Sequence, residues 1–257
     1  MSTNAPAMLL AAGRGQRMRP LTDASPKPLL PVRGKPLMQW LLEALRRGGC
    51  TQVVVNTAWL GDQISDAFGE QPVQSQLEGM RIAYSHEGLD FGRALETAGG
   101  IARALPLLGD LFWLCAGDIY APQFDFSNQA VARFKASGML AHIWLVPNPA
   151  QHPKGDFALG ADGLLHNEVN SRAPQRTTYS TIGLYRAAFF ASLPKGNPEG
   201  LVVPLVPLMR QAIDNGQMSG ELYLGEWADV GTPERLAQIN NAAPPTDSTP
   251  SNNLSPA

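Results

Sequence analysis

Two basic side chains, Arg17 and Lys27, lie close to a glycine-containing segment at residues 11–15. This segment follows a short apolar run, residues 7–10, which predicts a buried strand that turns directly into a loop. The backbone N–H groups of such a loop can approach an anion closely, and fixed cations beside it add favourable charge. The segment therefore predicts a binding site for a triphosphate.

The loop matches neither of the two common phosphate-binding patterns. Met18 stands where a dinucleotide-binding Gly-x-Gly-x-x-Gly motif has its third glycine, and no Gly-x-x-x-x-Gly-Lys-Ser/Thr string occurs in the chain. A bare Gly-x-Gly pair is more often an ordinary turn than a binding site. The full string at residues 10–30, with its two cations, is far more specific.

Two aspartates are placed where carboxylates could hold a divalent cation. Asp118 follows an apolar run at residues 111–116, and the carboxyl end of a central parallel strand opens into the ligand crevice of an α/β sheet. Asp229 ends a second predicted strand, before a Gly-Thr-Pro string that opens a helix. Either residue alone could be a capping or turn aspartate. The pair beside a cationic loop suits Mg²⁺ bound to a nucleoside triphosphate.

The elements that must position these residues alternate between helix and strand in the first half. Residues 36–48 have a wide apolar helical face and end at a glycine pair, and a β-branched strand at 52–56 follows after a short connection. This order is typical of a parallel βαβ unit and predicts a doubly wound α/β fold. The pattern continues with predicted helices at 62–68 and 97–105 and strands at 80–84 and 111–116.

The second half changes to strands with longer connections, which predicts a subregion appended to the first half. The predicted strands are 139–146, 157–159, 179–185 and 221–229, and the predicted helices are 127–136, 207–215 and 233–241. No internal repeat is present.

Size and composition indicate one large α/β domain at residues 1–241 and a disordered tail at 242–257, which is rich in Pro, Ser, Asn and Thr. The chain has 257 residues, of which 44% are hydrophobic, and a net charge of −2 argues against a nucleic-acid partner. No signal peptide or membrane-length apolar run is present. Cys50 and Cys115 lie in apolar surroundings, which favours buried, reduced thiols and a cytoplasmic location.

Taken together, these strings resemble the sugar-1-phosphate nucleotidylyltransferase family. The resemblance rests on residues 10–22, 26–30, 117–118 and 227–232, in order over nearly the whole chain except the tail. It implies a Rossmann-like, three-layer αβα nucleotide-diphospho-sugar transferase fold with a mixed, mostly parallel sheet. Further strings at 56–61, 95–100, 148–157 and 219–223 are similar to family members that transfer UMP from UTP to N-acetylmuramate 1-phosphate in peptidoglycan recycling.

The resemblance also implies roles for the candidate residues. The sugar phosphate would attack the α-phosphorus of UTP in line; because a phosphate monoester has a second pKa of about 6, no general base is required. Arg17 would stabilise the triphosphate, Lys27 would bridge the reacting phosphates, and Asp118 with Asp229 would hold Mg²⁺. The residues expected to line the nucleotide are Ala11, Ala12, Gly13, Arg14, Gly15, Glu96, Thr97, Ala98 and Gly99.

The sugar side carries weaker signals, and several alternatives stay open. Its candidates are Asp156, Glu168, Asn170 and Thr181. Ile119 and Val169 stand where many family members have an asparagine and a lysine, so the usual sugar contacts are not expected here. A mannose- or glucose-1-phosphate nucleotidylyltransferase and a non-catalytic nucleotide-sugar sensor are alternatives, and the protein could be a monomer or a homodimer.

Overall fold

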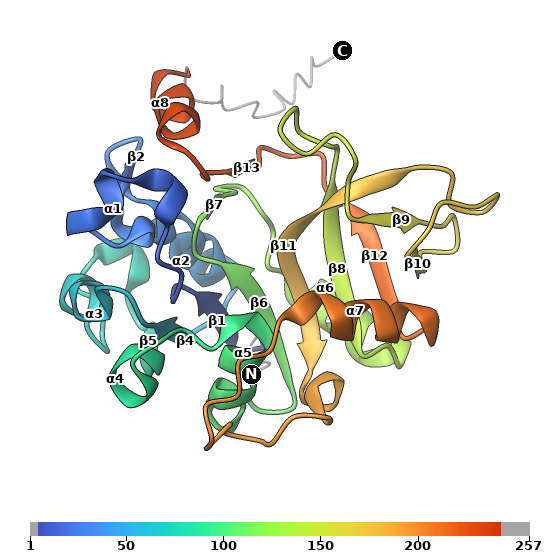
Figure 1. Cartoon of the computed structure of the whole chain (residues 1–257), viewed down its shortest axis with the longest axis horizontal. Coiled ribbons are helices and arrows are strands. Elements are labelled where there is room, and N and C mark those ends of the chain that lie inside the picture. The colour runs from blue at the N-terminus through green and yellow to red at the C-terminus, as the bar shows by residue number, and fades with distance from the viewer. Residues whose placement is uncertain (1–4, 243–257) are drawn as a thin grey trace, which may run out of the picture.

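The computed structural model describes residues 5–242 and shows helices on both faces of a central sheet (Figure 1). The strands are β1 (Ala7–Leu10), β2 (Pro31–Val32), β3 (Lys35–Pro36), β4 (Gln52–Thr57), β5 (Arg81–His86), β6 (Leu111–Ala116), β7 (Ile119–Tyr120), β8 (Ala141–Val146), β9 (Phe157–Leu159), β10 (Leu165–His166), β11 (Arg176–Arg186), β12 (Met218–Leu222) and β13 (Ala228–Asp229). The helices are α1 (Leu21–Ala24), α2 (Leu37–Arg47), α3 (Gly61–Phe68), α4 (Glu87–Phe91), α5 (Glu96–Leu108), α6 (Asn128–Ser137), α7 (Leu205–Asp214) and α8 (Pro233–Asn241). The short 3₁₀ helices are η1 (Gln16–Met18), η2 (Lys27–Leu29), η3 (Ser75–Leu77) and η4 (Ala187–Phe190).

The first half of the chain forms the parallel part of the sheet, in the order β6-β1-β4-β5. The register pairs Leu10 of β1 with both Asn56 of β4 and Ala116 of β6. Because these parallel strands end level with one another, the loops that follow them converge at one edge of the sheet. The predicted doubly wound α/β first half is confirmed.

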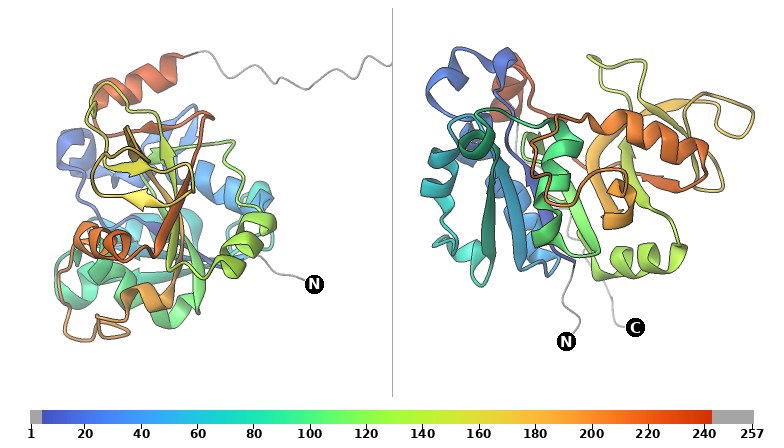
Figure 2. Two further views of the ribbon diagram at one scale, coloured as in Figure 1. Left: turned by 90° about the vertical axis from the view of Figure 1, so that its right-hand side faces the viewer. Right: turned by 60° about the horizontal axis from the view of Figure 1, so that its bottom comes forward.

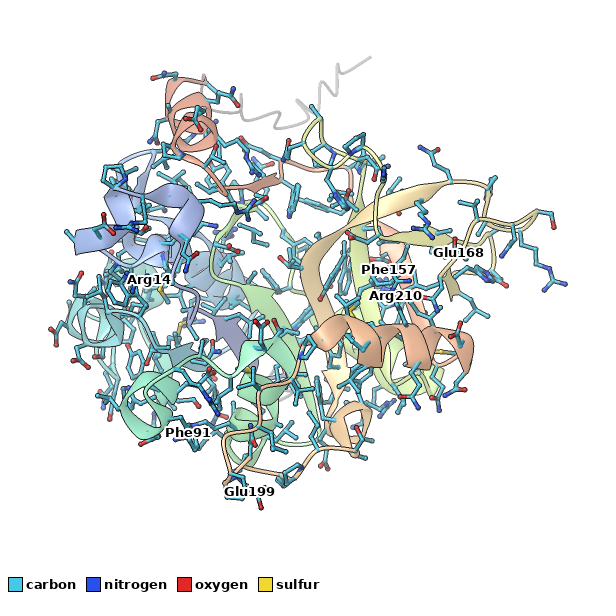
Figure 3. The ribbon with its side chains drawn as sticks, in the orientation of Figure 1. Arg14, Phe91, Phe157, Glu168, Glu199 and Arg210 are labelled. Atoms are coloured by element: carbon cyan, nitrogen blue, oxygen red, sulfur yellow. The ribbon has the colours of Figure 1, made fainter. Side chains whose placement is uncertain are left out.

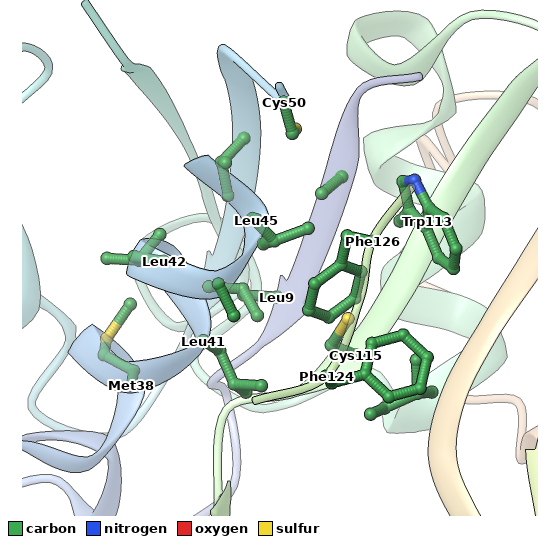
Figure 4. Packing of buried hydrophobic residues seen from close by; sticks show 14 of the residues in the cluster. Leu9, Met38, Leu41, Leu42, Leu45, Cys50, Trp113, Cys115, Phe124 and Phe126 are labelled. Carbon is green, nitrogen blue, oxygen red and sulfur yellow. The ribbon is translucent and has the colours of Figure 1, made fainter. Parts of the chain in front are cut away.

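The central strands are buried on both faces, which explains their continuous apolar sequences. In β1, Ala7 and Leu9 belong to the core beneath α2, α3 and α6, whereas Met8 belongs to the core beneath α5 and α7. Successive side chains of a strand point to opposite faces, so a strand between two helical layers needs apolar residues at every position. Figure 4 shows the first core, where Leu41 and Leu45 of α2 pack toward Leu9.

Strand β11 connects this parallel part to the second half of the sheet. It pairs antiparallel with β6, β8 and β9 along its length, and its register against β8 shifts between Tyr179 and Gly183. Strand β12 then adds parallel to β8, and β10 adds antiparallel to β9 (Figure 2). The expected three-layer αβα fold with a mixed sheet is therefore confirmed, and most of its parallel pairing lies in the first half.

One predicted strand is wrong. The sequence at 221–229 was expected to be a single strand, but the structure has β12 ending at Leu222 and the two-residue β13 beginning at Ala228. Between them the chain bends at Gly225, where an added Cβ would lie only 2.3 Å from the Tyr223 hydroxyl. Asp229 therefore lies in a small two-stranded sheet with β7 and not at the end of a strand of the central sheet.

The predicted tail at 242–257 lies, beyond its first residue, outside the described residues. Among residues 5–242, no helix is both long and apolar enough to cross a membrane. Cys50 and Cys115 are both buried free thiols, as expected.

Candidate active site

A cleft with a volume of about 770 Å³ opens at the carboxyl ends of β1, β4 and β6, within the size range of small-molecule sites. Four parts of the chain form its walls: the glycine loop after β1, the entrance to α5, the bent middle of β11 and the start of α7. The first two lie over the parallel part of the sheet and the last two over the second half (Figure 1). The cleft is therefore a junction between the two halves of the fold.

The glycine loop is anchored to the protein on one side and exposed to the cleft on the other. Gly15 adopts a left-handed φ of 65°, and the Thr22 hydroxyl donates to its carbonyl oxygen at 2.8 Å. Met18, which replaces the third glycine of the dinucleotide motif, is fully buried in a small core with residues of β7 and α8. Gly13 and Arg14 remain exposed at the cleft. The loop thus presents its backbone to the cleft at a fixed place.

Lys27 and Asp118 come together across 91 residues of sequence as an ion pair. The Lys27 ammonium lies 2.6 Å from the Asp118 carboxylate, and Lys27 is only 6% exposed. The backbone N–H of Gly117 donates to the carbonyl oxygen of Leu10 at 2.8 Å, which sets Asp118 beside the end of β1. Arg17, in contrast, is exposed at the cleft, and its guanidinium has no hydrogen-bond or ion-pair partner among residues 5–242.

Asp229 lies next to Asp118 in the backbone, but its carboxylate is paired elsewhere. In the β7–β13 pair, Asp229 stands opposite Ile119, and the N–H of Val230 donates to the Asp118 carbonyl oxygen at 3.2 Å. The Asp229 carboxylate accepts a 2.5 Å hydrogen bond from the guanidinium of Arg235 on α8. Each candidate metal-binding carboxylate therefore has a basic partner of its own in this state.

The entrance to α5 forms the next wall, and only part of the predicted segment reaches the cleft. Glu96, which has an unusual φ of 58°, and Thr97 line it. Ala98 and Gly99 are buried behind it, and their N–H groups donate to the Val203 carbonyl oxygen at 2.9 and 3.1 Å. Because those amides are already used within the protein, the geometry gives no support to a nucleotide contact by these two residues.

The four predicted sugar-side residues do not gather in one place. Thr181 lines the cleft, with a φ of 63° where β11 bends. Asp156 lies outside the cleft lining and accepts a 2.9 Å hydrogen bond from the Tyr179 N–H. The Glu168 side chain is 76% exposed and pairs with Arg176, far from Arg14 of the glycine loop (Figure 3).

Asn170 also lies outside the cleft lining. Its side-chain oxygen accepts from the N–H groups of Arg172 and Ala173, which is the bonding of a local turn. Sugar contacts by Asp156, Glu168 and Asn170 stay predictions, and Thr181 has the position that such a contact requires.

Several cleft residues were missed by sequence reasoning. Asn56 and Glu87 follow the strand-end rule that pointed to Asp118, since Asn56 lies near the end of β4 and Glu87 directly follows β5. Others are apolar or aromatic residues of the second half, and no local pattern indicates their place: Tyr179, Pro204, Leu205, Val206 and Met209.

A backbone loop with adjacent cations, set at the carboxyl ends of parallel strands, is typical of α/β proteins that bind phosphate-containing ligands. A family model described as nucleotidyl transferase matches residues 6–155. The chain belongs to the nucleotidyl transferase family.

Two curated relatives with the same name cover most of the chain. The N-acetylmuramate alpha-1-phosphate uridylyltransferase of Neisseria meningitidis serogroup B is 44% identical over 92% of this chain and 97% of its own length. The protein of that name from Caulobacter vibrioides is 31% identical over 89% of this chain and 92% of its own length. A UTP–glucose-1-phosphate uridylyltransferase from Synechocystis is 42% identical over 88% of this chain, but only 60% of its own length is covered.

Solved structures of much lower identity share the fold. A UDP-glucose pyrophosphorylase complexed with UDP-glucose has a TM-score of 0.71 at 17% identity, covering 93% of this chain and 98% of that chain. HddC from Yersinia pseudotuberculosis has a TM-score of 0.67 at 17% identity, covering 91% of this chain and 97% of that one. At this identity the likeness extends to the fold alone.

Proposed function

We propose that the protein transfers UMP from UTP to N-acetylmuramate α-1-phosphate, forming UDP-N-acetylmuramate and pyrophosphate. The 44% identity to the Neisseria relative, which extends over 97% of that protein, carries the proposal. The cleft supports it, because the glycine loop, Arg17, Lys27 and Asp118 all line one cavity at the sheet edge.

The reaction needs positioning and charge neutralisation more than acid–base catalysis. A phosphate oxygen of the sugar 1-phosphate attacks the α-phosphorus of UTP, and the bond from that phosphorus to the bridging oxygen of pyrophosphate breaks. Lys27, held at 2.6 Å from Asp118, is placed to exchange this partner for the reacting phosphates. The exposed guanidinium of Arg17 is placed to bind the outer phosphates and the leaving pyrophosphate.

We further propose that Asp118 and Asp229 would hold Mg²⁺. Both carboxylates are partly exposed, 39% and 31%, and they come from neighbouring backbones. Mg²⁺ takes few protein ligands and completes its shell with phosphate and water oxygens, so this donor set suits it. Among the described residues no cluster of three acidic, His or Cys side chains could hold a metal. When bound, the ion would neutralise charge on the phosphates, and phosphate oxygens of the nucleotide would supply its remaining ligands.

A glucose-1-phosphate uridylyltransferase is the second candidate. The Synechocystis relative, 42% identical over 88% of this chain, favours it. The shorter coverage of that relative, 60%, places it behind the N-acetylmuramate candidate.

The experiment incubates the purified full-length protein with Mg²⁺, UTP or GTP, and N-acetylmuramate, glucose or mannose 1-phosphate, and measures pyrophosphate release. We expect the highest kcat/KM with UTP and N-acetylmuramate 1-phosphate. A preference for glucose 1-phosphate would replace the proposal with the second candidate. Absence of release with every pair would favour a non-catalytic sensor.

Two substitutions test the metal assignment. Asp118→Asn and Asp229→Asn should abolish Mg²⁺-dependent turnover while the thermal unfolding temperature changes little, because each removes an anionic ligand from a partly exposed position. Asp66→Asn, at an exposed position of α3, is the matched control. Near-normal Mg²⁺-dependent rates in both variants would show that these carboxylates do not hold the metal.

A further inference from the structure

A continuous chain of three hydrogen bonds crosses beneath the nucleotide side of the cleft. The backbone N–H of Ala11 donates to Asn56 Oδ1 at 2.8 Å, and Asn56 Nδ2 donates to Glu87 Oε1 at 2.6 Å. The other oxygen of this carboxylate, Glu87 Oε2, accepts from the backbone N–H of Leu95 at 2.7 Å. The chain therefore links the glycine loop to the entrance of α5 through two side chains.

Both side chains of this chain are buried. Asn56 is 3% exposed and Glu87 is fully buried, and burial raises the pKa of the Glu87 carboxyl while its two hydrogen bonds oppose that shift. A buried carboxylate is costly unless its oxygens are matched by donors, and here both are matched. Such a residue is not needed for packing, which an apolar side chain would serve better.

The surroundings are built closely around this pair. A Cβ added at Gly100 of α5 would lie 2.4 Å from Glu87 Oε1 and 2.9 Å from Asn56 Nδ2, so only glycine leaves room there. The chain of bonds therefore accounts for Asn56 and Gly100 in two sequence strings, 56–61 and 95–100, to which the glycine loop and the metal site assign no role.

The two backbone segments that it links are those that face a nucleotide. Ala11 lines the cleft at the start of the glycine loop, and Leu95 directly precedes Glu96 and Thr97 on the opposite wall. The strands that carry these segments, β1 and β5, are not neighbours, since β4 lies between them (Figure 1). Among residues 5–242, no backbone hydrogen bond joins Ala11 to Leu95, and the side chains of Asn56 and Glu87 supply the direct connection between the two walls.

We propose that Asn56 and Glu87 are positioning residues that fix the width of the nucleotide half of the cleft through the Ala11–Asn56–Glu87–Leu95 hydrogen-bond chain. The proposal rests on nucleotide binding as proposed above but not on the identity of the sugar. Neither side chain takes part in the reaction, because both oxygens of Glu87 and the Asn56 amide are engaged within the protein.

The chain of bonds can be broken and rebuilt by exchanging the two functional groups. In Glu87→Gln, the new side-chain amide group faces a donor, either Asn56 Nδ2 or the Leu95 N–H, so one hydrogen bond is lost. In Asn56→Asp, the new carboxylate faces the Glu87 carboxylate, so the middle hydrogen bond has no donor. The double variant Asn56→Asp/Glu87→Gln restores all three hydrogen bonds, with the middle one donated in the opposite direction. Glu199→Gln, at an exposed loop position that points outward (Figure 3), is the matched control.

The readout is UTP affinity, measured by calorimetry on the full-length protein with Mg²⁺ and no sugar 1-phosphate, together with thermal unfolding. Each single variant should bind UTP about tenfold or more weakly, as expected when a hydrogen bond to a charged group is lost. The double variant should recover to within about threefold of the unchanged protein, as coupled residues in a mutant cycle do. In turnover, the KM for UTP should change more than kcat, because Lys27 and Asp118 are untouched.

Single variants that bind UTP normally, or a double variant that binds no better than either single one, would overturn the proposal. If both single variants fail to fold, recovery of folding and binding in the double variant still supports it, and failure of the double variant overturns it. UTP binding without transfer to any sugar 1-phosphate would overturn the proposed function and leave the positioning role standing. Absence of nucleotide binding by the unchanged protein would overturn both.

Discussion

The two halves of the cleft, the one proposed to bind the nucleotide and the one proposed to bind the sugar, are built on different plans. On the nucleotide side, loops converge from level parallel strands, and buried side chains such as Met18 and Asn56 hold them from behind. On the sugar side, the wall consists of the bend of β11 and the start of α7, which are far apart in the sequence. Asp156, outside the lining of this wall, forms hydrogen bonds with the His152 ring and the Tyr179 N–H.

This difference shows which part of the cleft has its polar groups positioned by the fold itself and which part can vary in sequence. Parallel strands that end level place backbone amides and strand-end carboxylates at one edge whatever the ligand, so the nucleotide half is tied to the architecture. The sugar half is lined by apolar residues of α7, of which Val206 is half exposed while Leu205 and Met209 also belong to the core. We expect substrate choice to be determined there.

The largest effect should come from removing the cation of the nucleotide half. Lys27→Met should lower kcat by at least about 100-fold, the usual loss when one preorganised charge at a reacting group is removed. It would also leave the Asp118 carboxylate without its 2.6 Å partner. The measurement is pyrophosphate release at saturating substrates, with Lys195→Met on an exposed loop as the control. A loss below tenfold would mean that the reacting phosphates do not depend on this lysine.

A smaller effect is expected at the bend of β11, where a substitution should increase the stability of the protein. Thr181 has a φ of 63°, a left-handed conformation that costs a non-glycine residue about 1–2 kcal/mol. Thr181→Gly should therefore increase the free energy of unfolding by up to about 1 kcal/mol, since glycine loses part of this gain through chain entropy. We expect the KM for the sugar 1-phosphate to rise, because the variant loses a polar side chain from the cleft lining.

Chemical denaturation and steady-state kinetics measure these two quantities separately. Thr177→Gly, on the same strand without a positive φ, should instead destabilise the protein. If Thr181→Gly is as destabilising as Thr177→Gly, backbone strain is not present at the bend.

Asp156 offers a sharper test of the sugar half. Asp156→Asn should change the KM for the sugar 1-phosphate by less than about threefold, because an amide oxygen can still accept from the Tyr179 N–H and the side chain lies outside the cleft lining. Initial rates at varied sugar 1-phosphate measure this. A tenfold increase in KM would restore the sugar contact predicted from the sequence and make the two halves more alike.

The smallest effect concerns acid stability of the second half. Burial lowers the pKa of His142 on β8 below its ordinary value of 6.5, so the unfolded chain binds this proton more readily than the folded protein does. The stability contributed by neutral His142 is full above pH 6.5 and is lost as the pH falls through the lowered pKa.

His142→Gln should therefore flatten the dependence of the unfolding free energy on pH between 7 and 5, because it removes a group whose pKa is lower in the folded protein than in the unfolded chain. Urea unfolding at each pH measures it. An unchanged slope would show that the ring is solvated enough to titrate normally in the folded protein.

The sequence predicted the parallel part of the sheet well for reasons that are local. The apolar runs of β1 and β6 are each followed within three residues by a glycine, Gly13 or Gly117, so a short window of sequence is enough to recognise a buried strand that ends in a loop. The position of Asp118 at the end of a strand predicted that it would lie near the glycine loop. Its ion pair with Lys27 became visible only in the structure.

The sequence said less about the second half because its geometry depends on contacts between distant segments. The residues at 221–229 were expected to form one strand, yet the chain bends at Gly225, where Tyr223 packs against Phe124, a residue about 100 positions earlier in the sequence. Likewise, β11 is longer than predicted and bends at Thr181 because β6, β8 and β9 pair with different parts of it. No window of sequence contains these partners.

The Val203 carbonyl that covers the first turn of α5 has a consequence for how a ligand enters. A helix N-terminus normally attracts anions through its free amides and its dipole. Here the amides of Ala98 and Gly99 are occupied, and the carboxylate of Glu96 stands in the first turn. The α5 end of the cleft is thus unattractive to a polyanion, while the opposite end carries Arg17 and Lys27. We therefore expect a bound nucleotide to lie with its phosphates at the glycine loop and its base at the start of α5.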